Sequence, residues 1–142
     1  MYKSILLPID LSAPASWSQS LPAALQMMGK GGTLHVLTVI PDFGMSVVGS
    51  FFEKGFEKKA LRQVGEKLTE WVRSNVDDGI DVHPHVTHGR VYEQIINAAD
   101  KLEVDAIVIA AHTPELADYL LGPNAARVVR HAKQSVFVVR GS

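Results

Sequence analysis

The chain has 142 residues, with 14 basic and 15 acidic side chains, no cysteine and 46% apolar residues. This length fits one domain around a single substantial core. The net charge of −1 argues against a protein that binds nucleic acid by neutralising phosphates. Without cysteine, disulfides and cysteine-based metal sites are excluded. No apolar run approaches the roughly 18 residues of a membrane span, and residues 1–10 lack a signal-peptide pattern. We therefore expect a single cytoplasmic domain, residues 1–142, without membrane insertion.

Short apolar runs alternate with longer segments of helical period, a pattern that predicts βαβ units around a parallel sheet. Strands are expected at residues 4–9, 33–40, 80–87, 105–110 and 135–140, and helices at residues 17–28, 53–75, 91–102 and 125–132. The predicted fold class is α/β: a single, doubly wound, Rossmann-like open sheet of five parallel strands with helices on both faces. A loop without clear period is expected between Pro41 and Phe52.

The character of each apolar run predicts its place in the sheet. Residues 4–9 and 105–110 are almost continuously apolar, as strands covered on both faces are, so these two are expected at the centre. Residues 80–87 alternate apolar and polar side chains and include Pro84, which favours an edge strand. In the first helical segment, Ser12 or Ser16 is expected to cap the helix, and Pro22 to kink it or mark a late start.

The expected central strands point to a ligand site. Open parallel sheets bind ligands beyond the carboxyl ends of their strands, where the strand order reverses. One central strand ends in Pro8-Ile9-Asp10, and Gly122 precedes the last helix. A helix start favours a phosphate through its unpaired N–H groups and its dipole, and a buried acid at a strand tip can accept hydrogen bonds from a ribose or base. The pattern indicates a nucleotide site without specifying a reaction.

Several segments together resemble the universal stress protein family, along the whole chain. They are residues 1–10 with their Pro-Ile-Asp ending, residues 35–40, and above all the run Leu-Leu-Gly-Pro-Asn-Ala-Ala-Arg-Val-Val-Arg-His-Ala at residues 120–132, followed by residues 136–140. The resemblance implies a five-stranded parallel α/β domain, usually a homodimer, and one branch of the family binds ATP. Val136–Val139 is either a core strand alone or, as the resemblance implies, also the dimer seam. A bare apolar edge strand invites aggregation and needs a partner or cover.

The resemblance also implies a set of site residues. Asp10 falls at the family's adenosine-holding acid, Val39 at the residue whose main chain contacts adenine, and Gly89 beside the nucleotide. Gly122 matches the last glycine of the phosphate motif, which is Gly, two residues, Gly, nine residues, Gly, then Ser or Thr. The implied nucleotide-binding residues are Pro8, Ile9, Asp10, Val39, Gly89, Ala110, His112, Gly122, Asn124 and Ala125. The implied ligand is ATP, or AMP or ADP, with or without Mg²⁺.

The chain departs from this phosphate motif in three respects. The first glycine is replaced by Ala110, which is disfavoured if the position requires a positive φ. Pro123 stands at the Ser or Thr position and offers neither an N–H nor a hydroxyl. The second glycine of the motif is missing, and the loop that would carry it is one residue shorter than in the family. Two functions stay open: an adenine-nucleotide-binding regulatory module in the stress response, or a homodimeric interaction protein with a decayed pocket. Because no catalytic base is evident, we expect at most slow ATP hydrolysis or self-phosphorylation.

Structural roles remain open for several of these residues. Asp10 is alternatively a helix cap for the segment that follows, and Asn124 is alternatively the N-cap of the last helix. Near the edge strand, His83 and His85 share a face, while His88 falls on the opposite one. We expect exposed histidines on this edge strand rather than a metal site.

Overall fold

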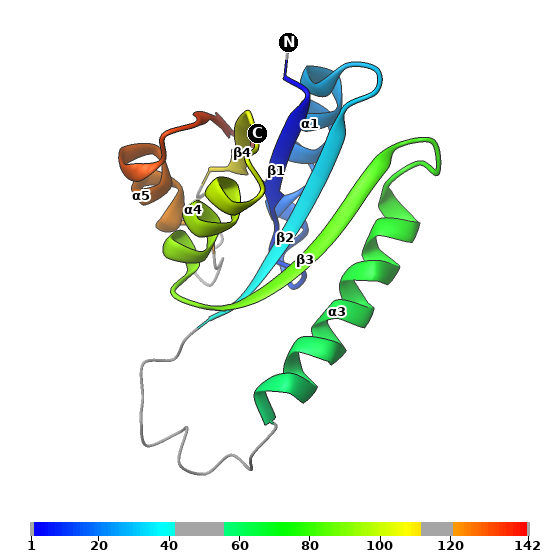
Figure 1. Ribbon diagram of the computed structural model, residues 1–142, viewed down its shortest axis with the longest axis vertical. Helices are drawn as coiled ribbons and strands as arrows, with labels where there is room; N and C mark the ends of the chain where they lie inside the picture. Colours follow the sequence, from blue (N-terminus) through cyan, green and yellow to red (C-terminus); the bar gives the residue numbers. More distant parts are fainter. Residues whose placement is uncertain (1, 42–55, 112–120, 142) are drawn as a thin grey trace.

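The computed structural model describes residues 2–41, 56–111 and 121–141 (Figure 1). Within these residues, five parallel strands form one sheet in the order β3-β2-β1-β4-β5. The strands are β1 (Ser4–Pro8), β2 (Thr33–Pro41), β3 (Asp81–Gly89), β4 (Ala106–Ala110) and β5 (Ser135–Val139). The helices are the 3₁₀ turn η1 (Pro14–Ser16), α1 (Ser20–Met28), α3 (Phe56–Asn75), α4 (Val91–Lys101) and α5 (Asn124–His131). The predicted α/β class is confirmed.

The position of each strand follows its apolar pattern. Every residue of β4 is buried, and β1 is buried from Ile5 onward, so both lie inside the sheet as predicted. The alternating strand with Pro84 is β3, which forms one edge of the sheet, with β2 as its neighbour. That prediction is also confirmed, and β5 forms the other edge.

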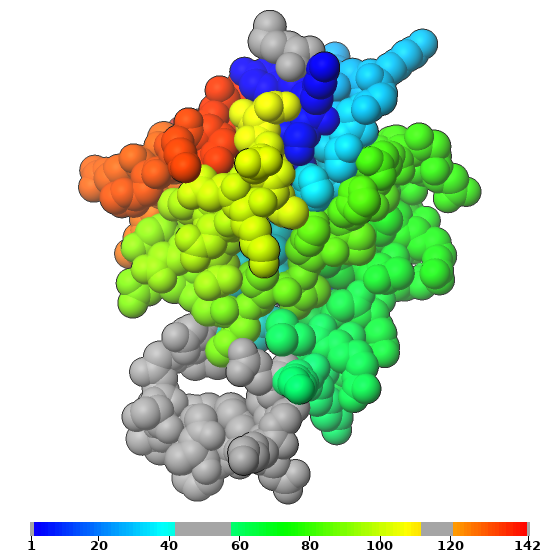
Figure 2. Space-filling model, viewed as in Figure 1, coloured from blue at the N-terminus to red at the C-terminus, as the bar shows by residue number. Residues whose placement is uncertain are grey.

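Two helical layers cover the sheet, which makes the fold doubly wound. On one face, α4 and α5 pack on Leu6, Leu37 and Ile107 of the strands. On the other face, α1 and α3 pack on side chains that alternate with these, such as Ile5 and Val36. In Figure 2, α4 and α5 lie on one side of the molecule, and α3 with β3 lies on the other. Each face of the sheet therefore has its own core.

The helix starts correct two predictions. Helix α1 begins at Ser20, so that Pro22 lies in its first turn, where the missing N–H is harmless. The late start is confirmed, but the cap position is Gln19, with no side-chain cap bond, so neither Ser12 nor Ser16 caps this helix. Likewise Pro123, not Asn124, occupies the N-cap position of α5. Both serines instead bond to Asp10, as described below.

Two predicted features lie outside the described residues. The expected loop between Pro41 and Phe52 falls there, apart from Pro41 itself, which ends β2. The same holds for His112. The predicted long helix is described from Phe56 to Asn75, and its central residue Leu68 is fully buried.

Candidate functional site

The strand order reverses between β1 and β4. From β1 the chain moves outward to β2 and β3, and then crosses to β4 and β5 on the other side. The register of β1 with β2 extends to Pro8, whereas its register with β4 extends only to Leu6. Because the N–H of Ile9 bonds to β2 at Leu37, the nitrogen of Pro8 faces β4, where it has no hydrogen to donate. The β1–β4 backbone pairing therefore ends before the carboxyl ends of the two strands. This is the position where such sheets bind ligands.

Asp10 lies directly after β1 with only 4% of its surface exposed. Its Oδ1 accepts hydrogen bonds from the N–H of Ser12 at 3.0 Å and from the Ser12 hydroxyl at 2.7 Å. The hydroxyl of Ser16 accepts from the Asp10 N–H at 2.8 Å and donates to the Asp10 carbonyl at 3.0 Å. Asp10 thus caps its own turn rather than a helix. The result is a buried carboxylate held in a fixed orientation at the strand tip.

The main chain of Val39 points toward the same place. In a parallel strand, alternate residues direct their N–H and C=O toward the same neighbour. Leu37 accepts its bond from Ile9 of β1, so the main-chain groups of Val39 also face the β1 side, two residues beyond the last β1–β2 pair, Pro8↔Leu37. The hydroxyl of Thr38 donates to the Ile9 carbonyl at 3.3 Å and holds the two chain segments together. Polar main-chain groups of β2 and the Asp10 turn therefore adjoin.

Two helix N-termini lie beside this edge. The last residue of β3, Gly89, has φ 145°, and a Cβ placed there would lie 2.7 Å from Nε2 of Gln94. Glycine is therefore required at the entry to α4. The side-chain oxygen of Asn124 accepts from the N–H of Tyr92 at 3.2 Å, which joins the starts of α4 and α5. The positive ends of two helix dipoles thus adjoin at one point.

The start of α5 differs from the expected arrangement in one respect. The N–H groups of Asn124 and Ala125, predicted to receive a phosphate, both donate to the carbonyl of Leu121, at 3.1 and 3.2 Å. Gly122 is buried within the same turn, and Pro123 is exposed. A phosphate bound by these two N–H groups would therefore have to replace the turn's own hydrogen bonds.

Ala110 carries no backbone strain. It ends β4 in register with Val139, and among the described residues the one non-glycine residue with positive φ is Glu103.

Several of the predicted site residues share one apolar cluster. This cluster contains the predicted residues Val39, Ala110 and Ala125 and their neighbours Val91 and Leu121. The sequence did not predict that Ser16 bonds to Asp10 or that Tyr92 bonds to Asn124. Nothing in the sequence marks which distant group a serine hydroxyl or a backbone N–H will contact.

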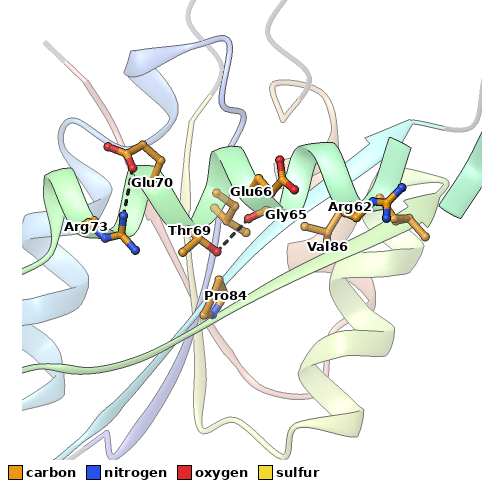
Figure 3. A pocket seen from close by; sticks show the side chains of 10 residues that line it. Arg62, Gly65, Glu66, Thr69, Glu70, Arg73, Pro84 and Val86 are labelled. Carbon is orange, nitrogen blue, oxygen red and sulfur yellow. Dashed lines mark hydrogen bonds and ion pairs between the residues drawn. The ribbon is translucent and has the colours of Figure 1, made fainter. Parts of the chain in front are cut away.

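A groove lies elsewhere on the protein, and none of the described residues that line it belongs to the predicted nucleotide site. It measures about 670 Å³ and lies between α3 and β3 (Figure 3). Its lining includes Gly65 and Leu68 of α3 and Pro84 and Val86 of β3. Charged side chains of α3, including the bonded pair Arg73 and Glu70, line it as well. The groove is separate from the carboxyl edge of the sheet.

Neither a metal-binding cluster nor a membrane-spanning helix is present among the described residues. No three histidine, cysteine or acidic side chains in that part of the chain are arranged to hold a metal ion. None of the helices described there combines the length and apolar character needed to cross a membrane.

The fold and the edge just described define a doubly wound α/β protein with a buried acid at its switch point. The model of the universal stress protein family matches residues 1–140. Universal stress protein G of Shigella flexneri is 30% identical over 142 residues, which cover 99% of this chain and 100% of that protein. The chain belongs to the universal stress protein family.

Solved structures agree with this assignment. The hypothetical protein MJ0577 has a TM-score of 0.73 and 26% identity, covering 100% of this chain and 98% of its own. A universal stress protein in complex with cAMP has a TM-score of 0.66 and 17% identity, with coverages of 99% and 98%. A family protein from Arabidopsis thaliana with AMP bound has a TM-score of 0.65 and 13% identity, with coverages of 99% and 92%. At these last two identities the likeness shows the fold alone.

Proposed function

We propose that this universal stress protein is an adenine-nucleotide-binding regulatory module in the stress response. The observation that carries the proposal is the buried carboxylate of Asp10 at the switch point. Its Oδ1 is bonded to Ser12, and its backbone is fixed by Ser16, so that the acid is pre-oriented toward a ribose or base. That two family members of the same fold hold cAMP and AMP supports an adenine ligand.

In this proposal, each part of the edge has a separate role. The carboxylate of Asp10 accepts a hydrogen bond from the ribose, and the main chain of Val39 reads the adenine. The joined N-termini of α4 and α5 attract the phosphates, because both helix dipoles favour negative charge there. With Pro123 exposed and Asn124 engaged with Tyr92, we expect the phosphate end to be held more weakly than the nucleoside end. ATP, ADP and AMP are then bound with similar affinity.

Calorimetric titration of nucleotide-stripped protein tests the proposal. ATP, ADP, AMP and cAMP are titrated with and without Mg²⁺, into the parent protein, Asp10→Asn and Asp78→Asn. Asparagine keeps the oxygen that Ser12 requires but removes the charge, whereas Asp78 is exposed in a distant turn. A hydrogen bond to a charged group is worth about 1.5–3 kcal/mol, so Asp10→Asn should weaken binding by roughly 10- to 100-fold. Asp78→Asn should bind like the parent.

The opposite result favours the second function, a homodimeric interaction protein without a nucleotide. If millimolar ATP gives no heat and leaves the melting temperature unchanged, no nucleotide binds the folded state. Binding that persists unchanged in Asp10→Asn would place the nucleotide elsewhere on the protein.

We also propose that the protein acts as a homodimer through Val136–Val139. This segment lies in β5 at an edge of the sheet, and Val138 is 39% exposed there. An apolar edge strand is a template for pairing with a second chain. Sedimentation velocity of Val138→Lys should therefore show a monomer at concentrations where the parent and Ala126→Lys, changed at an exposed position of α5, are dimers. A parent that sediments as a monomer at every concentration contradicts the dimer.

A further inference from the structure

Three imidazole side chains lie together on the pair of strands at one edge of the sheet. His35 of β2 is in register with His83 of β3, and His85 follows two residues later on β3. Nδ1 of His35 lies 2.9 Å from Nε2 of His85, which is a hydrogen bond. The ring centroid of His35 lies 5.4 Å from that of His83 and 5.1 Å from that of His85. His35 alternates with the buried Val36 and therefore lies on the α4 side of the sheet.

A carboxylate orders the exposed end of this cluster. Oδ1 of Asp81 lies 2.9 Å from Nε2 of His83, and its Oδ2 accepts from the hydroxyl of Thr33 at 2.9 Å. Side chains of β2 and β3 therefore bond to each other at two levels, through Thr33 with Asp81 and through His35 with His85. These bonds add to the backbone ladder that holds β3 in the sheet.

The bond between His35 and His85 depends on protonation. One imidazole nitrogen must carry a hydrogen and the other must offer a lone pair. Two neutral rings satisfy this, and so does a pair that shares one extra proton. When both rings are protonated, both nitrogens are donors and both rings are positive. The bond is then lost and replaced by repulsion.

Burial and the neighbouring rings oppose this protonation. The pKa of His35 lies below its ordinary value, because burial disfavours the imidazolium and because His85 and His83 repel it, while Asp81 acts in the opposite direction. The pKa of His85 is also lowered, by burial and then by His83. The charged side chains of the overlying helix α4, Glu93, Asp100 and Lys101, contribute to neither shift, and β1 places the apolar Leu6 beside His35.

We propose that His35, His83 and His85 form an acid-sensitive latch, which holds the edge strand β3 on β2 at neutral pH and releases it on acidification. The edge position makes release feasible, because β3 pairs with β2 while β1 and β4 lie inside the sheet. The helix α3 packs on β3 and loses part of its support when β3 is released. The latch does not depend on the proposed nucleotide.

The direction of the pH effect follows from linkage. Both histidines bind protons less readily in the folded protein than in the unfolded chain, where the pKa is about 6.5. Their contribution to stability is therefore fully present above about pH 6.5 and is lost as the pH falls below it.

Urea unfolding between pH 8 and pH 5, in the presence of EDTA to exclude metal ions, tests the latch. The parent is compared with the double variant His35→Gln/His85→Gln and with His88→Gln, a histidine of β3 on the opposite face. Each excluded proton changes the unfolding constant by up to tenfold per pH unit. From pH 6.5 to 5.5, the unfolding constant of the parent and of His88→Gln should rise by up to about 30-fold more than that of the double variant, because each unfolded imidazole goes from half to almost fully protonated over this step. Parallel curves for the parent and the double variant would overturn the proposal.

A second measurement uses the parent alone and needs no folded variant. Imidazole NMR should give His35 and His85 titration midpoints below about 6.5. Hydrogen exchange, corrected for intrinsic rates, should show that amides of β3 lose protection at pH 5.5 while those of β4 keep it. A titration midpoint at or above about 6.5 for either ring, or equal loss of protection in β3 and β4, would contradict the proposed latch.

Discussion

The side-chain oxygen of Asn124, at the start of α5, accepts a 3.2 Å hydrogen bond from the backbone N–H of Tyr92, at the start of α4. The N–H groups of a first helical turn have no partner within their own helix, so one helix here supplies the partner for another. The ring of Tyr92 reinforces the contact, because the guanidinium carbon of Arg127 lies 5.4 Å and the ring of His131 lies 6.0 Å from its centroid. The starts of α4 and α5 therefore form one unit beside the switch point.

Asn124→Ala should destabilise the protein by about 1–3 kcal/mol, since it leaves the Tyr92 N–H without its acceptor in a part-buried place. Asn124→Asp keeps the acceptor and should retain stability, but its charge should weaken binding of a nucleotide phosphate. Urea unfolding measures the first effect and calorimetric titration the second. Asn97→Ala, at an exposed position of α4, is the control. Equal stability of Asn124→Ala and Asn97→Ala would mean that the bond contributes nothing.

Two glycine-to-alanine substitutions should change stability in opposite directions. At Gly89, with φ 145°, a Cβ would lie 2.7 Å from Nε2 of Gln94, so alanine should destabilise by about 1–3 kcal/mol. At Gly65, within α3, a Cβ would meet no atom within 4 Å, so alanine should stabilise by about 0.5–1 kcal/mol. Chemical denaturation of both variants measures the pair. If Gly89→Ala proved as stable as the parent, the inference that the start of α4 requires glycine would be wrong.

Much of the fold follows from local patterns that the sequence displays directly. Continuous apolar runs at residues 4–9 and 105–110 predicted the central strands, and Pro84 in an alternating run predicted the edge. Pro22 predicted either a kink or a late start of α1, and the structure has the late start, which places this proline in the first turn, where it is tolerated. In each case the decisive physical constraint acts within a few residues of chain.

The missed features depend on which distant residues meet. His35 was not predicted beside His85, because their contact requires the register of β2 with β3, and nothing in either strand specifies that register by itself. The alternative role of Asn124 as the cap of its own helix is wrong, and the contact with Tyr92 that replaces it depends on how α4 and α5 pack. The serine cap failed for a related reason, because the hydroxyl of Ser16 bonds to Asp10 across a turn. Register and packing are properties of the whole fold.

Trp71→Phe should change stability by no more than about 1 kcal/mol, whereas Trp71→Ala should destabilise by about 3–5 kcal/mol. The indole packs edge-on against Trp17, with ring centroids 5.6 Å apart, and is 7% exposed. Its buried Nε1 has no hydrogen-bond partner among the described residues. Phenylalanine removes this unsatisfied donor, which offsets much of the lost apolar area. If Trp71→Phe lost as much stability as Trp71→Ala in urea unfolding, removal of the unsatisfied donor would not offset the lost packing, and this prediction would be wrong.

Thr33→Val should raise the pKa of Asp81 toward its ordinary value. The main cause of the lowered pKa is the hydrogen bond from the Thr33 hydroxyl, followed by burial in the opposite direction and by the charge of His83. An acid whose pKa is lower in the folded state contributes stability above its unfolded pKa, and that stability is lost as the pH falls through the folded value. Thr33→Val should therefore lower the stability at neutral pH and reduce the part of it that is lost on acidification, because the Asp81 contribution becomes smaller. Carboxyl ¹³C NMR measures the titration of Asp81 directly.

Thr87→Val is the matched control, because the buried hydroxyl of Thr87 has no partner among the described residues. If both variants left the Asp81 midpoint unchanged, the bond across the two strands would not govern its titration.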